Sequence, residues 1–189
     1  MKTSYNSPVI LTLTFLSAAV LIIDTSTGIP LTEALFTAAP RGYFNPLSPV
    51  SYFRLFSHII GHGGWDHLLS NFTIILLIGP ILEEKHGPGR LFVMIMTTAL
   101  VTALINLFFF DTALMGASGI AFMMIILGSI TNIRRGEIPL TFILVVLLFL
   151  TKEVVMMTAQ DNISQTAHIA GGICGSMFGF NQKSESIQM

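Results

Sequence analysis

The sequence has few charged residues for its length. Only 10% of its 189 residues are Asp, Glu, Lys or Arg, compared with about 25% in an average soluble domain. Too few polar side chains are present to cover a surface that faces water, and 52% of the residues are hydrophobic. The net charge of −1 also lacks the basic excess on which nucleic-acid binding depends. The composition therefore predicts a protein of the lipid bilayer without a nucleic-acid partner.

Cysteine is nearly absent as well. The single cysteine, Cys174, excludes an internal disulfide and a zinc site built from several cysteines. Three histidines could in principle hold a metal: His58, His62 and His67. However, no H-E-x-x-H occurs, and the nearby carboxylate of Asp66 is expected on a different helix face from His62. We therefore expect no metal, and we expect His62 to pack and hydrogen-bond inside the segment around it.

Six apolar stretches are present, and each predicts a membrane-crossing helix. They cover residues 8–23, 67–82, 91–110, 116–130, 138–150 and 166–180. Several are shorter than the roughly 20 residues that cross a hydrocarbon core of about 30 Å, which a locally thinned bilayer accommodates. The first stretch follows Lys2 as a signal peptide would, but no A-x-A-like cleavage site follows, so we expect it to be retained. The pattern predicts an all-α membrane protein with six transmembrane helices.

A long connection, residues 24–64, separates the first two stretches. Its scattered prolines and aromatic residues are typical of a partly helical segment at headgroup level. With six helices both termini share one side, and that side collects six of the nine Lys and Arg residues. The positive-inside rule therefore places both termini in the cytoplasm, including a short tail over residues 181–189. We expect residues 1–189 to form one membrane domain with a core over about 52–180.

The fourth stretch opens on MGASG, which places a serine at its edge. Gly116 and Gly119 flank Ser118, and glycine lets the backbone approach a substrate closely. Ser118 is therefore a candidate nucleophile. His168 begins the sixth stretch on the same predicted side, from which it could take the hydroxyl proton and return it to a leaving group. From this pattern alone, an interfacial histidine with a packing role remains the alternative.

Other polar residues near the same predicted depth have two possible roles. His67 and Asn71, four residues apart on one helix face, would either bond to a neighbouring helix or donate to an oxyanion at Ser118. Structural roles are expected for two charged residues. Glu83 ends the second stretch, either solvated or bonded to a loop backbone or an arginine. Arg54 is expected to brace the outer connection through backbone carbonyls.

In order along the chain, these residues resemble the motifs of the rhomboid family of intramembrane serine proteases. The matching segments are HLLSN for HxxxN (67–71), GASG for GxSG (116–119) and AHIAGGICG for AHxxGxxxG (167–175). The outer-loop pattern and the GxxxExxxG pattern are matched in kind by Arg54, Ser57, His58 and His62 and by Gly79, Glu83 and Gly87. Small residues at the spacing of Gly171 and Gly175 let a neighbouring helix approach closely.

The resemblance implies roles for individual residues. Ser118 would be the nucleophile and His168 the base and acid, while His67, Asn71 and the Ser118 amide would form the oxyanion site. Position 122, often tyrosine in the family, is Phe122 here; its ring could stack on the histidine but offers no hydroxyl. The fold implied is a six-helix bundle without metal or cofactor, and residues 152–165 would form a mobile cap.

The function implied is hydrolysis of a peptide bond in or beside a transmembrane segment of another membrane protein. The expected location is the bacterial inner membrane, as a multi-pass protein in contact with the lipid bilayer. Three alternatives remain at this point: a non-catalytic rhomboid-like binder of membrane clients, a small transporter, and a sorting-type rhomboid that trims C-terminal anchors. A transporter would be expected to show inverted repeats or an acidic residue at mid-depth, and neither is found. The oligomeric state is not predicted.

Overall fold

The computed structural model describes residues 4–130, 140, 143–144, 147–148, 151 and 165–185. The helices named in these ranges are α1 (Pro8–Thr27), α2 (Leu31–Leu35), α3 (Pro49–Ser57), α4 (Trp65–His86), α5 (Pro88–Phe109), α6 (Ser118–Ile130) and α8 (Gln165–Glu185). Ala38 and Leu114 form an isolated bridge, and no strand is named in this part of the chain. The predicted helical class is confirmed.

Three helices, α1, α4 and α5, are long and apolar enough to cross a membrane, and two shorter apolar helices cover Ser118–Ile130 and Ala167–Phe180. The structure thus has the apolar helices of a membrane protein. Most of the predicted helix over 138–150 and nearly all of the predicted cap over 152–165 lie outside the described residues. Six crossing helices and the cytoplasmic side of the termini therefore stay predictions.

Local sequence explains where α1 begins and ends. Pro8 lies in its first turn, where the missing N–H is not needed, and Gly28 follows its end with φ 71°. The helix continues four residues beyond the predicted end at residue 23, so residues 24–27 of the predicted outer connection are helical. The reason is local: the hydroxyls of Thr25 and Thr27 donate to carbonyls one turn earlier, which lets polar residues continue the helix.

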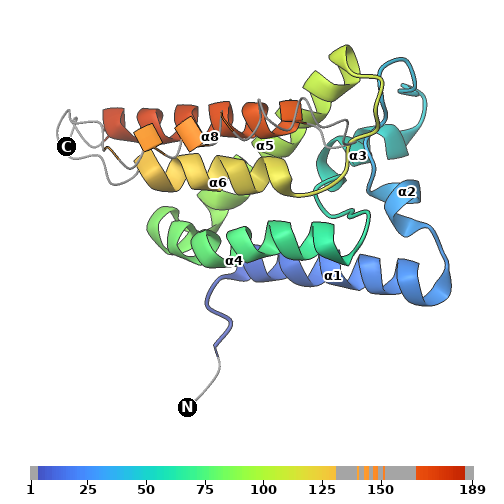
Figure 1. Ribbon diagram of the computed structural model, residues 1–189, viewed down its shortest axis with the longest axis horizontal. Helices are drawn as coiled ribbons and strands as arrows, with labels where there is room; N and C mark the ends of the chain where they lie inside the picture. Colours follow the sequence, from blue (N-terminus) through green and yellow to red (C-terminus); the bar gives the residue numbers. More distant parts are fainter. Residues whose placement is uncertain are drawn as a thin grey trace.

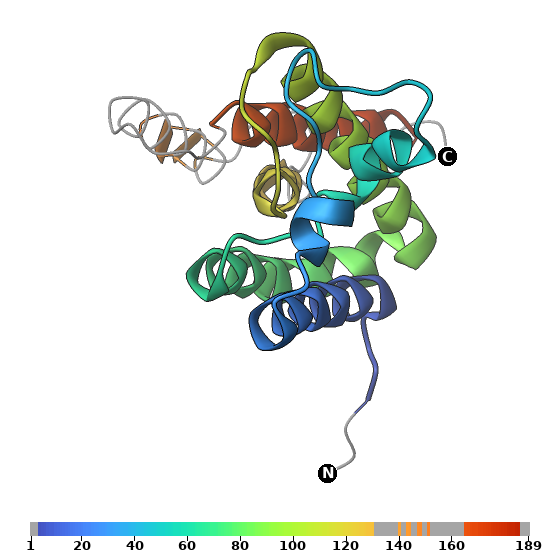
Figure 2. The ribbon, with the colours of Figure 1, turned by 90° about the vertical axis from the view of Figure 1, so that its right-hand side faces the viewer.

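Helix α6 lies in the middle of the bundle, where Figure 2 shows it end-on between α4, α5 and α8. Its residues are buried on nearly all sides, which fits a helix that is apolar all round. Helix α8 packs against it through glycines. A Cβ on Gly171 would run into the carbonyl of Gly119, and a Cβ on Gly175 would run into that of Met123. The glycine stripe predicted for helix packing therefore lies on the α6–α8 contact.

The direction of the helices decides where their first residues lie. In Figure 1, α4, α6 and α8 all begin at the end of the bundle where α2 and α3 lie, whereas α1 begins at the opposite end. Because His67, Ser118 and His168 each belong to the first turn or near it, all three lie at this same end. The sequence-based expectation that they share one depth is consistent with this arrangement.

Candidate active site

The loop that leads into Ser118 takes a shape that requires glycine. Gly116 has φ 111°, in the left-handed region that residues with a side chain rarely adopt. A Cβ on Gly116 would also lie 2.6 Å from Nε2 of His67 and 3.5 Å from Nδ2 of Asn71. Gly116 therefore lets two polar side chains of α4 come against the backbone beside Ser118, on the shared face that their spacing predicts.

The connection between α1 and α4, residues 28–64, holds the same loop from another direction; we call it the outer segment. The N–H of Gly116 donates to the carbonyl oxygen of His58 at 2.9 Å. The N–H of Ala117 lies 3.5 Å from Nε2 of His62, a long contact at the limit of a hydrogen bond. The residues before Ser118 are thus tied to the segment between α3 and α4, which no spacing in the sequence would have indicated.

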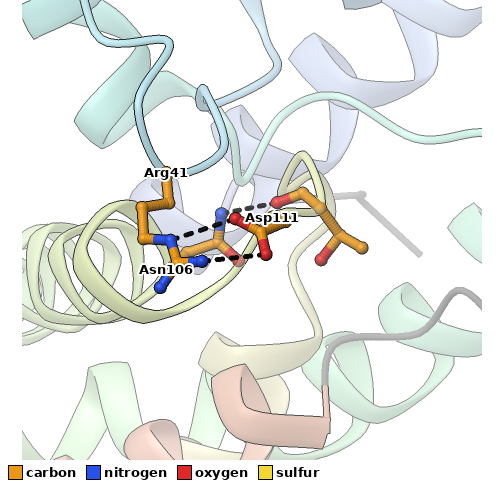
Figure 3. Close-up of polar contacts among 4 residues, drawn as sticks. Arg41, Asn106 and Asp111 are labelled. Atoms are coloured by element: carbon orange, nitrogen blue, oxygen red, sulfur yellow. Dashed lines mark hydrogen bonds and ion pairs between the residues drawn. The ribbon is translucent and has the colours of Figure 1, made fainter.

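Side chains also fix the connection between α5 and α6 (Figure 3). Arg41 makes two hydrogen bonds to the carboxylate of Asp111, of 3.0 and 3.1 Å, and the amide of Asn106 donates to the carbonyl oxygen of Thr112 at 2.8 Å. Sequence reasoning missed these residues. Arg41 and Asp111 stand 70 positions apart, so nothing local pairs them. Asn106 did carry a signal, because an amide inside an apolar stretch needs a partner.

His168 lies in the first turn of α8 and is buried. Its ring lies 4.5 Å from the ring of Phe122, centroid to centroid, at an interplanar angle of 38°. Phe122 follows Ser118 by one helical turn, so both residues lie on the same side of α6. The first turns of the two helices also touch, since a Cβ on Gly119 would lie 3.1 Å from the Ala167 carbonyl. Phe122 and His168 are thus in contact as expected, but their rings are tilted and not stacked.

Two further histidines are held neutral in the outer segment. Burial lowers the pKa of His58 and of His62 to about 4, and this effect outweighs their hydrogen bonds to the backbone carbonyls of Ala99 and Ile60, which raise it. His62 also lies 3.1 Å from Nδ2 of Asn71, so it packs and hydrogen-bonds as expected. Within the described ranges, no three His, Cys, Asp or Glu side chains are grouped so as to hold a metal ion.

Three other residues singled out in the sequence make structural contacts. Glu83 is at the opposite end of α4 from His67, where its carboxylate accepts the N–H groups that begin α1. Arg54 donates to the carbonyl oxygens of residues 33 and 34 in α2, which confirms the expected brace. Gly175 packs against α6 one turn below Gly171. Glu83 follows His67 by more than four turns of α4, so these two side chains cannot share a small site.

The comparisons with known proteins agree with the order of the motifs. The family model described as Rhomboid domain matches residues 49–183, which is more than two thirds of the chain. Rhomboid-related protein 1 of Caenorhabditis elegans is 27% identical over 138 residues, a stretch that covers 67% of this chain and 39% of the relative. The chain therefore spans about two fifths of the length of this curated relative.

Proposed function

The chain belongs to the rhomboid family, and from this we propose that it is an intramembrane serine endopeptidase that cleaves transmembrane segments of other membrane proteins. The observation that carries the proposal is the meeting of three helix starts around one loop. His67 and Asn71 border Gly116, Ala167 at the start of α8 lies against Gly119, and the His168 ring contacts that of Phe122. Ser118 is the first residue of α6.

In the proposed reaction, the Ser118 hydroxyl attacks the carbonyl carbon of the scissile peptide and passes its proton to His168. The tetrahedral oxyanion accepts hydrogen bonds from His67, Asn71 and the Ser118 amide. His168 then gives the proton to the departing amine, which leaves an acyl-enzyme. Water, activated by the same imidazole, attacks the ester and releases the second product and the serine hydroxyl.

The packing around His168 supports its proposed role as the base. The Phe122 ring lies against His168 at a tilt, and the glycines of α8 let the helix approach α6 closely, so packing helps to orient the imidazole. The proposed substrates are membrane proteins whose helix unwinds near the cut, because a helical carbonyl is already hydrogen-bonded. A small residue before the cut would fit beside Gly116 and Ala117. We also propose the bacterial inner membrane as the location.

Replacement of the proposed nucleophile and base tests this function. We expect Ser118→Ala and His168→Ala, purified in detergent and mixed with a model transmembrane substrate, to lose at least 1000-fold in kcat, since both groups take part in every bond-making step. Ser129→Ala is the matched control, because this serine lies on the same helix and donates to its own backbone at Ile125. It should cleave at the wild-type rate.

A serine-directed fluorophosphonate probe separates a protease from a non-catalytic binder. The wild type should be labelled covalently, and Ser118→Ala should not. A wild-type protein that stays unlabelled and does not cleave, yet still binds membrane clients, would replace the protease proposal with the binder. Wild-type turnover by either Ser118→Ala or His168→Ala would refute the dyad.

A further inference from the structure

His62 contacts two of the groups that surround the proposed oxyanion site. Its Nδ1 lies 3.0 Å from the carbonyl oxygen of Ile60. A carbonyl accepts only from a protonated nitrogen, so Nδ1 carries the ring proton. The low pKa of His62, about 4, keeps the ring neutral at pH 7. Its Nε2 is therefore a lone-pair acceptor.

Two N–H donors converge on that lone pair. One is the carboxamide nitrogen of Asn71, at 3.1 Å, and the other is the Ala117 amide, at 3.5 Å. An acceptor at this place selects the NH2 end of the Asn71 side chain and repels its oxygen. The same Asn71 nitrogen lies beside Gly116, because a Cβ added to Gly116 would be 3.5 Å from this nitrogen.

The His62 ring is itself held by aromatic neighbours. It lies edge-on to His67 at 5.0 Å between centroids and tilted against Phe72 at 5.6 Å. The side chain is almost fully buried. Because packing and the Ile60 carbonyl fix the ring together, the direction of the Nε2 lone pair is fixed as well.

We propose that His62 is a positioning residue for the proteolytic reaction. Its Nε2 lone pair accepts a hydrogen bond from one N–H of the Asn71 carboxamide, so that the NH2 end faces Gly116 and the second N–H stays available to the oxyanion. By also accepting from Ala117, it ties the residue before Ser118 to the same ring. This inference rests on the proposed function, because it gives Asn71 its role in the oxyanion site.

The physical consequence of losing the acceptor is a freely turning carboxamide. A turned Asn71 would present its oxygen, which repels an oxyanion in place of stabilising it. Removal of one oxyanion donor costs about 100- to 1000-fold in kcat. Loss of its orientation alone, with part of the population still correctly turned, should cost about 10- to 100-fold.

The test compares His62→Met with His62→Gln, two side chains of equal length. Gln reaches the position of Nε2 with an amide oxygen that accepts, whereas Met brings no strong acceptor. We expect His62→Met to lower kcat 10- to 100-fold with KM nearly unchanged, and His62→Gln to restore most of the loss. Both are checked for folding by thermal unfolding in the same detergent, and His62→Leu replaces His62→Met if that variant does not fold.

Coupling to Asn71 separates positioning from a general structural role. In an Asn71→Ala background, His62→Met should lose most of its effect, because the carboxamide that it orients is gone and only the long contact with the Ala117 N–H remains. His58→Met is the matched control: this equally buried imidazole lies 3.0 Å from the Ala99 carbonyl, not from Asn71. In the double variant, the kcat losses caused by His58→Met and by Asn71→Ala should multiply.

The two levels of the proposal fail differently. Wild-type turnover by Ser118→Ala overturns the proposed function. Suppose instead that Ser118→Ala is inactive and Asn71→Ala is impaired. If the kcat of His62→Met then equals that of the wild type, or if its kcat loss multiplies fully with the loss caused by Asn71→Ala, only the role of His62 is overturned.

Discussion

At the scale of single residues, the glycine before the serine sets the geometry of the site. Gly116 combines a left-handed backbone, φ 111°, with a neighbour that leaves no room for a Cβ. Other glycines meet only one of these conditions. Gly42 has φ 81° with open space around it, and Gly119 has close neighbours in a helix. The two glycines of the GxSG pattern are therefore needed for different physical reasons. Gly116 is needed for its backbone conformation and for space, and Gly119 is needed for helix packing.

A Gly116→Ala substitution should affect both stability and cleavage. The left-handed backbone alone costs an alanine about 1–2 kcal/mol, and the methyl group would push the His67 ring away from the site. We expect at least a tenfold loss of kcat in the detergent assay. Gly42→Ala carries the same kind of backbone strain without a clash, so it should lose stability only. Equal kcat for Gly116→Ala and the wild type would show that the approach of His67 is not needed.

At the scale of helices, Glu83 joins α4 to α1 through the free N–H groups of a helix start. Its two carboxylate oxygens lie 3.0 and 3.1 Å from the N–H groups of Val9 and Ile10. One turn earlier, Gly79 leaves room for the Ile10 side chain, whose Cδ1 would lie 2.6 Å from an added Cβ. A buried anion at a helix N-terminus satisfies two donors and the helix dipole at once. The pattern around Glu83 is thus a device for helix docking.

Replacement of this carboxylate should destabilise the fold while leaving the active site intact. Glu83→Gln keeps one acceptor but turns an NH2 group toward an N–H, and we expect the free energy of unfolding to fall by about 1–3 kcal/mol. Glu84→Gln, at the exposed neighbouring position, should change it by less than about 0.5 kcal/mol. Thermal unfolding of both proteins in one detergent checks this. Equal melting temperatures for the two variants would exclude the docking role.

Sequence reasoning succeeded where the signal was local and periodic. The apolar stretches predicted α1, α4, α5 and α6, and the four-residue spacing of His67 and Asn71 predicted their common face. It did not find the contacts that join distant segments. Neither the acceptor of the Gly116 N–H nor the partner of Arg41 could be read from spacing, because both depend on how the outer segment folds back over α5 and α6.

At the scale of the whole molecule, buried and uncharged parts of the outer segment hold the loop before Ser118 in place, and we call these parts the clamp. The clamp consists of the residues around His58 and His62 together with the Ala38–Leu114 bridge. The exposed Arg41–Asp111 pair adds little, because surface ion pairs contribute only about 0–1 kcal/mol. The main electrostatic feature is that two imidazoles must stay uncharged inside the fold. Stability should therefore depend on pH in mildly acidic solution.

The sign of this dependence follows from the two pKa values. In the unfolded chain each histidine has a pKa near 6.5, and in the folded protein His58 and His62 have a pKa of about 4. Between these values the unfolded state binds more protons, so stability is complete above about pH 6.5 and is lost as the pH falls toward 4. The loss at pH 4 should be on the order of 3 kcal/mol for each histidine.

Unfolding of the inactive Ser118→Ala protein in detergent, at pH values from 7.5 to about 4, measures this without self-cleavage. We expect the melting temperature to fall steadily below pH 6.5, and His58→Met to flatten that fall by up to about half, since one of the two histidines with the largest pKa shifts is removed. His86→Gln, a change of a half-buried histidine at the far end of α4, should leave most of the slope in place. A melting temperature that stays constant down to pH 4.5 would mean that these imidazoles are already charged in the fold, and the clamp would then need another explanation.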